Sequence, residues 1–152
     1  LNCTQLHIVA HSLGGIMAMH LLEKHPELPV ERIVMLGTPI KGSYAAEKIS
    51  RWNIVGRLLT KSMASGLDGN HAFKPQQHQI GMIAGNINSP IGLGLLLGKL
   101  PEENDGTVLL SETKHPAISE HIVVNKSHTG LIFSKKVSGL IANFLKTGHF
   151  PN

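Results

Sequence analysis

The sequence predicts an α/β domain in which helices pack on a parallel sheet. Short apolar runs rich in β-branched residues alternate with segments whose apolar residues recur at helical spacing, a pattern typical of parallel sheets connected through helices. The composition agrees, since 41% of the 152 residues are hydrophobic and only 16% are charged, far from the composition of disordered chains. We therefore expect one folded domain.

The first three elements form a predicted strand–helix–strand unit. Leu6–Ala10 is a short apolar run typical of a buried strand. From Gly15 onward apolar residues recur at helical spacing until Pro26, which ends the helix. Arg32–Leu36 is a second buried run, followed by a Gly-Thr-Pro turn at 37–39. Together they predict a βαβ unit, whose crossover is nearly always right-handed.

The remaining elements continue the alternation after an interruption. The segment 43–74 mixes apolar residues at partly helical spacing with glycines, which favours a small helical cap-like insertion. Gln79–Ala84 and His121–Val124 are the predicted third and fourth strands, and 91–105 is a long loop between them. A terminal helix from Gly130 places its apolar residues on one face; these are Ile132, Val137, Leu140, Ile141, Phe144 and Leu145.

Composition also excludes several kinds of function. The net charge is +4, but the 14 Lys and Arg are scattered and aromatic residues make up only 4%, so nucleic-acid binding is not favoured. The single cysteine, Cys3, excludes a disulfide framework and a cysteine zinc cluster. His7 and His11 lie in a predicted strand rather than on one helix face, so we expect no metal site. The longest apolar run, 91–98, is short of the roughly 20 residues of a membrane span.

One serine lies where a predicted strand turns sharply into a helix. In Ala10-His11-Ser12-Leu13-Gly14 the residues two places before and after Ser12 are small, as a close crossing of strand and helix requires. The segment resembles the nucleophile elbow G-x-S-x-G of the α/β-hydrolase family, with Ala10 in place of the first glycine. The resemblance implies that Ser12 is a nucleophile and that the Leu13 N–H is an oxyanion donor. The alternative is a serine that merely caps the helix.

The family resemblance also implies an acid that follows the serine along the chain. Asp105, in Asn104-Asp105-Gly106-Thr107-Val108, resembles the Asp-Gly-x-Val segment of lipases. A plain Asn-Asp-Gly turn is the alternative, and Glu102 and Glu103 are nearby substitutes. The other aspartate, Asp68, falls within the insertion.

The base is expected to be a histidine after Asp105, because the family order is Ser, Asp or Glu, then His. Among ten histidines, His128 alone trails a predicted strand and closely precedes the terminal helix. The segment Lys126-Ser127-His128-Thr129-Gly130 matches the loop after the family's last strand. His115 and His121 are the runners-up.

Two segments suggest where a substrate binds. Gly37 to Ser43 resembles the Thr-Pro-x-x-Gly-Ser segment that lines the acyl pocket's rim in lipases, which implies a contact from Thr38. The insertion carries Trp52, Leu58 and Leu59, whose apolar side chains favour an acyl or other apolar substrate portion.

Together these motifs predict the C-terminal part of one α/β-hydrolase domain over residues 1–152. The resemblance covers almost the whole chain, but the family's first four strands are missing, and with them the second oxyanion donor. We expect a carboxylic-ester hydrolase of the lipase or esterase kind, acting on a small-molecule or lipid ester without metal or cofactor. An acyltransferase, thioesterase or amidase with the same triad, or a truncated inactive remnant, remains open. The sequence leaves the oligomeric state and the compartment open, with Cys3 alone favouring the cytoplasm.

Overall fold

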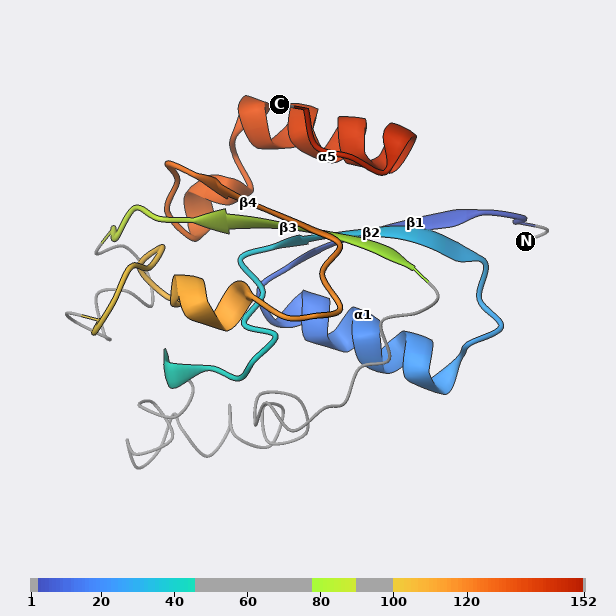
Figure 1. Cartoon of the computed structure of the whole chain (residues 1–152), viewed down its shortest axis with the longest axis horizontal. Helices are drawn as coiled ribbons and strands as arrows, with labels where there is room; N and C mark the ends of the chain where they lie inside the picture. The colour runs from blue at the N-terminus through green and yellow to red at the C-terminus, as the bar shows by residue number, and fades with distance from the viewer. Residues whose placement is uncertain (1–2, 46–77, 90–99, 152) are drawn as a thin grey trace.

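The computed structural model describes residues 3–45, 78–89 and 100–151. Its elements confirm the predicted parallel sheet with flanking helices, because four parallel strands lie in the order β1-β2-β3-β4 (Figure 1). In chain order the elements are β1 (Leu6–His11), α1 (Leu13–Lys24), β2 (Val30–Leu36), β3 (Gln79–Gly85), the 3₁₀ turn η1 (Leu110–Thr113), β4 (Glu120–Val124), the 3₁₀ turn η2 (Thr129–Leu131) and α5 (Lys135–Thr147). The cap-like insertion expected at 43–74 falls almost wholly outside the described residues.

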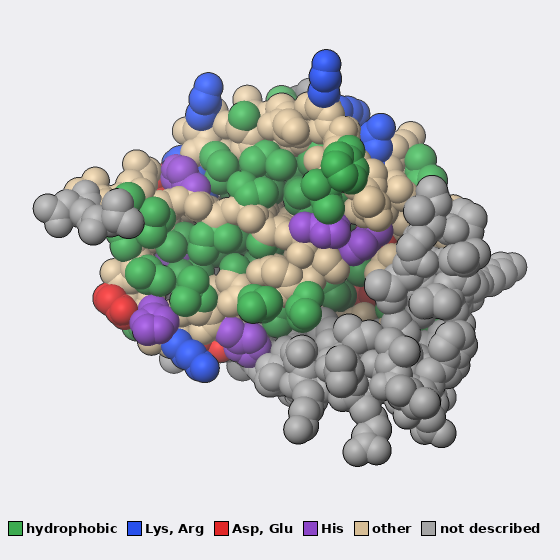
Figure 2. Space-filling model, turned by 180° about the vertical axis from the view of Figure 1, so that it is seen from behind, with side chains coloured by type: hydrophobic (Ala, Val, Ile, Leu, Met, Phe, Trp, Pro, Cys, Tyr) green, Lys and Arg blue, Asp and Glu red, His purple; other side chains and the backbone are tan. Residues whose placement is uncertain are grey.

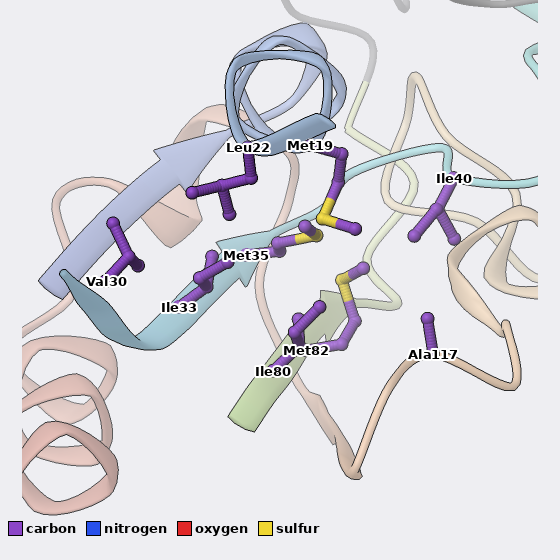
Figure 3. Packing of buried hydrophobic residues seen from close by; sticks show 9 residues of the cluster. All are labelled: Met19, Leu22, Val30, Ile33, Met35, Ile40, Ile80, Met82 and Ala117. Atoms are coloured by element: carbon purple, nitrogen blue, oxygen red, sulfur yellow. The ribbon is translucent and has the colours of Figure 1, made fainter. Parts of the chain in front are cut away.

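The sheet is covered by α1 on one face and by α5 on the other (Figure 1). Along β2 the side chains of Ile33 and Met35 join the core beneath α1, while Val34 and Leu36 join the core beneath α5. This alternation is the two-residue period of a strand buried on both faces. Figure 3 shows the first core, where Met19 and Leu22 of α1 point toward the side chains of the strands. The helices packed on the two faces therefore hold the strand ends in place. The candidate site lies at those ends.

The terminal helix begins later than its apolar pattern predicts. Residues Thr129–Leu131 form the 3₁₀ turn η2, and α5 starts at Lys135. Ser134 has an extended backbone and its hydroxyl accepts a hydrogen bond from the Val137 N–H at 3.4 Å, so it caps the helix at that point. As a consequence Ile132 lies before the helix and is 49% exposed instead of joining the buried face.

The β1 strand lies at one edge of the four described strands and pairs with β2 alone among them. Exposed apolar side chains on β1 and α1 include Leu6, Val9, Met17 and Leu21. Figure 2 shows the molecule from behind the view of Figure 1, with apolar side chains (green) gathered across the middle of this rear face. An edge strand with exposed apolar residues is a template for pairing with another chain.

We therefore expect the 152-residue chain to self-associate through β1. A Val9→Lys substitution places a charge on the edge at a site that is 47% exposed, which should raise the monomer fraction in size-exclusion chromatography. Phe133→Lys is the matched control, because Phe133 is 81% exposed but lies outside the strands. An equal gain from both variants would mean that general apolarity, rather than the strand edge, drives association.

In the part of the chain that the structure covers, no helix is long and apolar enough to cross a membrane.

Candidate active site

Ser12 lies alone between the end of β1 and the start of α1. Its backbone has φ 55° and ψ −128°, and it is the one residue other than glycine with positive φ in the described ranges. Such a conformation costs on the order of 1–3 kcal/mol and persists only where the surroundings impose it. Here the Ser12 N–H donates to the Leu36 carbonyl at 2.9 Å, and the Ser12 carbonyl accepts from the Gly15 N–H at 3.1 Å. The Ser12 side chain makes no capping hydrogen bond, so the capping alternative is not supported.

Small residues let the strand and the helix approach each other at this turn. A Cβ added to Gly15 would lie 2.2 Å from the Thr38 Oγ1, so only glycine fits there. Thr38 itself is fully buried, and its Oγ1 has no hydrogen-bond partner among the described residues. Thr38 therefore packs against the start of α1, and its predicted contact with substrate stays a prediction.

Asp105 and His128 are joined by a hydrogen bond. The His128 Nδ1 lies 2.7 Å from the Asp105 Oδ2, and the Asp105 side chain is almost completely buried. The other carboxylate oxygen, Oδ1, accepts from the Val108 N–H at 2.8 Å and from the Thr107 N–H at 3.0 Å. Because a carboxylate accepts, the Nδ1 carries the proton it donates, and the Nε2 is left as the nitrogen that can accept one.

The backbone reinforces this pair. The His128 N–H donates to the Asp105 carbonyl at 2.8 Å. Gly106, at φ 98°, turns the chain after Asp105, and its N–H donates to the Asn104 Oδ1 at 2.9 Å. This turn around Asp105 is the Asn-Asp-Gly turn that the sequence offered as an alternative, so turn formation and carboxylate placement are one arrangement.

The serine turn and the Asp105–His128 pair meet at the carboxyl edge of the sheet. Leu36, which accepts from the Ser12 N–H, is followed by Gly37 at φ 52°. A Cβ on Gly37 would lie 3.0 Å from the Asp105 Oδ2 and 3.1 Å from the His128 Nδ1. In the described part of the chain no hydrogen bond joins the Ser12 side chain to His128, as is common before substrate binds.

The other candidate residues lie elsewhere or outside the described ranges. Glu102 and Glu103 are exposed, and Glu103 accepts from the Asn86 side chain at 3.2 Å. The His121 Nε2 faces the Thr113 hydroxyl at 2.8 Å, and the His115 Nδ1 accepts from a backbone N–H. The cap residues Trp52, Leu58 and Leu59 and the alternative acid Asp68 fall within 46–77, outside the described residues. Across 3–45, 78–89 and 100–151, no group of three metal-ligating side chains could hold an ion.

The structure adds a buried acid that the sequence did not indicate. The Glu112 carboxylate accepts from the Leu109 N–H at 2.9 Å and from the Tyr44 N–H, and its carbonyl accepts from the Lys41 N–H at 3.1 Å. These bonds tie the segment after β2 to the segment after Asp105. Burial raises the pKa of Glu112. No motif marks this residue, because its partners are backbone groups brought together only by the fold.

Three histidines make stability sensitive to acid. Burial, the largest cause in each case, lowers the pKa of His11, His115 and His121 below 6.5. The unfolded chain therefore binds more protons than the folded chain as the pH falls below 6.5, so their contribution to stability is present above that pH and is lost on acidification. We expect these three histidines to lower the free energy of unfolding in this window.

Urea unfolding at about pH 7.5 and about pH 5 measures this loss. His121→Gln removes one of the titrating groups, so the difference in unfolding free energy between the two pH values should shrink. A variant with the same difference as the unmodified chain would show that His121 takes no part.

No protein-family model matches the chain, and no curated protein matches it. Among solved structures, the mature lipase BlEst2 of Bacillus licheniformis superposes with a TM-score of 0.62 at 23% identity, covering 93% of this chain and 64% of that one. Its propeptide form gives 0.64 at 20%, covering 97% and 36%, and the metagenomic carboxyl esterase MGS0156 gives 0.56 at 18%, covering 82% and 45%.

These likenesses establish the fold. The chain resembles a bacterial lipase and a metagenomic carboxyl esterase in structure, and its sheet and helices form part of an α/β-hydrolase fold. The chain spans less than two thirds of the length of each of these proteins.

Proposed function

We propose that this chain carries the nucleophile, the base and the acid of a serine hydrolase that cleaves carboxylic esters. The observation that carries the proposal is the 2.7 Å hydrogen bond between a buried Asp105 and His128, next to the strand end that holds Ser12 in its strained turn. The solved structures similar in fold include a lipase and a carboxyl esterase, which agrees with this chemistry. Because fold alone leaves the reaction open, the proposal rests on the site geometry.

The proposed reaction proceeds in two steps. The Ser12 Oγ attacks the ester carbonyl carbon while the His128 Nε2 takes the hydroxyl proton. When the tetrahedral adduct collapses, the C–O bond to the alcohol breaks and His128 returns the proton to the departing oxygen, which leaves an acyl-serine. Water then attacks this acyl group, again losing a proton to His128, and the carboxylic acid departs as Ser12 regains its proton. Asp105 holds the imidazole tautomer and stabilises the imidazolium throughout.

The tetrahedral oxyanion needs donors, and Leu13 is proposed as one of them. Leu13 is the first residue of α1, so its backbone N–H lies at a helix start where N–H groups lack helical partners. We propose that the second donor comes from a segment outside these 152 residues, as part of a longer domain. Two observations support this part of the proposal: the outer edge of β1 pairs with no other strand among the described residues, and the similar structures are longer.

The proposed substrate is a small-molecule or lipid ester with an apolar acyl portion. Trp52, Leu58 and Leu59 are proposed to contact that portion, from the sequence pattern alone. Ser12 and His128 carry every proton transfer in the scheme, and Asp105 orients and stabilises the base, so the scheme requires neither a metal ion nor an organic cofactor.

A fluorophosphonate probe tests the proposed nucleophile. Such a probe phosphonylates an activated serine but not an ordinary turn serine, because only the activated hydroxyl has a base beside it. In the full-length protein we expect the label on Ser12, located by peptide mass spectrometry, and loss of labelling in His128→Ala. Labelling at another serine, or equal labelling with and without His128, would contradict the proposal.

A panel of matched ester, thioester and amide substrates then separates an esterase from a thioesterase or an amidase.

A further inference from the structure

His11 contacts the proposed base without being part of the proposed triad. It is the last residue of β1 and immediately precedes Ser12. Its Nε2 lies 3.1 Å from the His128 carbonyl oxygen, and the two rings lie 4.5 Å apart at 45°. One strand end therefore supplies both the serine and a side chain that contacts the backbone and the ring of His128.

The direction of this hydrogen bond follows from its partners. A carbonyl oxygen only accepts, so the His11 Nε2 carries the proton and donates it. Among the described residues, the His128 backbone N–H and ring Nδ1 both hydrogen-bond to Asp105. Asp105 thus holds the ring and the backbone N–H of His128, and His11, at the end of β1, holds its backbone carbonyl.

From this geometry we infer that His11 is a positioning residue, which holds the His128 loop at a fixed separation from Ser12 by donating to the His128 carbonyl. The inference rests on the proposed function, because it assigns His11 a role through His128 rather than on the substrate. Ser12 and His128 come from segments far apart in the sequence, so proton transfer between them depends on a tie between β1 and the loop.

The electrostatics of the site support a neutral donor. Burial, and next the charge of His128, lower the pKa of His11. His11 therefore stays neutral near pH 7, and the imidazolium that forms on His128 during the reaction does not face a second cation.

Two substitutions separate the hydrogen bond from the bulk of the ring. His11→Phe keeps a ring of similar size but cannot donate, whereas His11→Gln has a side-chain N–H that can reach the carbonyl. In the full-length protein we expect His11→Phe to lower kcat for a p-nitrophenyl ester about tenfold, the effect of about one net hydrogen bond. KM should change little, since His11 is not assigned a substrate contact. His11→Gln should recover most of kcat.

His7→Phe is the matched control, since His7 lies on the same strand and is exposed, and it should leave kcat unchanged. Rates are normalised to the fraction of protein labelled by fluorophosphonate, so that misfolded protein does not enter kcat. Equal losses in His11→Phe and His11→Gln, or a wild-type kcat in His11→Phe, would overturn the inference. If His11→Phe does not fold, a tenfold loss of kcat in His11→Gln would overturn it by itself. Full hydrolysis by Ser12→Ala would instead overturn the proposed function, so the two failures are distinguishable.

Discussion

Ser12→Ala is expected to lower kcat for ester hydrolysis by about 10⁴–10⁶ in the full-length protein, because the acyl-enzyme cannot form without the hydroxyl. The residual rate should come from binding and the oxyanion donors alone. Initial-rate measurements with a short-chain p-nitrophenyl ester give this number directly. Ser12 is strained in its turn, so the unfolding midpoint of the variant should be measured alongside to show that the fold is retained.

The three members of the proposed triad are expected to act as a unit. Asp105→Asn should lower kcat by about 10⁴, because an amide N–H facing the His128 Nδ1 disfavours the tautomer that the base requires. Adding His128→Ala to Ser12→Ala should cost little more than Ser12→Ala alone, since losses within a triad do not add.

Two carboxylates serve as controls for the acid. Glu103→Gln removes an exposed carboxylate close to Asp105 in sequence, and Asp68→Asn removes the other aspartate. Both should leave kcat within a small factor of the value for the unmodified protein. A severe loss in either variant, together with a mild effect of Asp105→Asn, would show that the acid has been assigned to the wrong residue.

The parts of the fold that the sequence predicted are those fixed by local pattern. The strands near Leu6–Ala10, Arg32–Leu36, Gln79–Ala84 and His121–Val124 are continuous apolar runs, and such runs stand out because both faces of a parallel sheet are buried. The helix between the first two strands is bounded by a serine turn and by Pro26, which are local signals as well. The order Ser12, Asp105, His128 came from the family resemblance, and the described structure joins Asp105 to His128.

The features that the sequence missed depend on contacts between distant residues. An apolar pattern continues through Ile132, so the start of α5 is decided instead by the capping geometry of Ser134. Glu112 is a charged residue that the fold buries, which an apolar pattern cannot indicate. For His11 the sequence argues against a metal site, but it cannot indicate the contact with His128, which joins residues 117 positions apart.

Gly15→Ala is expected to damage both stability and activity, although it lies outside the proposed triad. A Cβ there would lie 2.2 Å from the Thr38 Oγ1 and 2.6 Å from its Cγ2, and Thr38 is fully buried. The helix start or the end of β2 must move, which should lower the free energy of unfolding by about 1–3 kcal/mol or more. Because the Gly15 N–H bonds to the Ser12 carbonyl, the same movement displaces the serine, so kcat should fall even in the folded fraction. Urea unfolding and kcat, normalised to labelled sites, measure the two effects.

Gly139→Ala and a double variant isolate the clash as the cause. A Cβ on Gly139, within α5, would meet nothing within 4 Å, so that variant should gain about 0.5–1 kcal/mol from helix propensity. Combining Gly15→Ala with Thr38→Ala removes the two nearest atoms and leaves the Thr38 Cβ at 2.9 Å. The double variant should therefore be more stable and more active than the sum of the two single losses predicts. This departure from additivity measures the coupling between positions 15 and 38. Simple addition of the two losses would show that the packing of Thr38 against α1 is not what requires glycine after the serine turn.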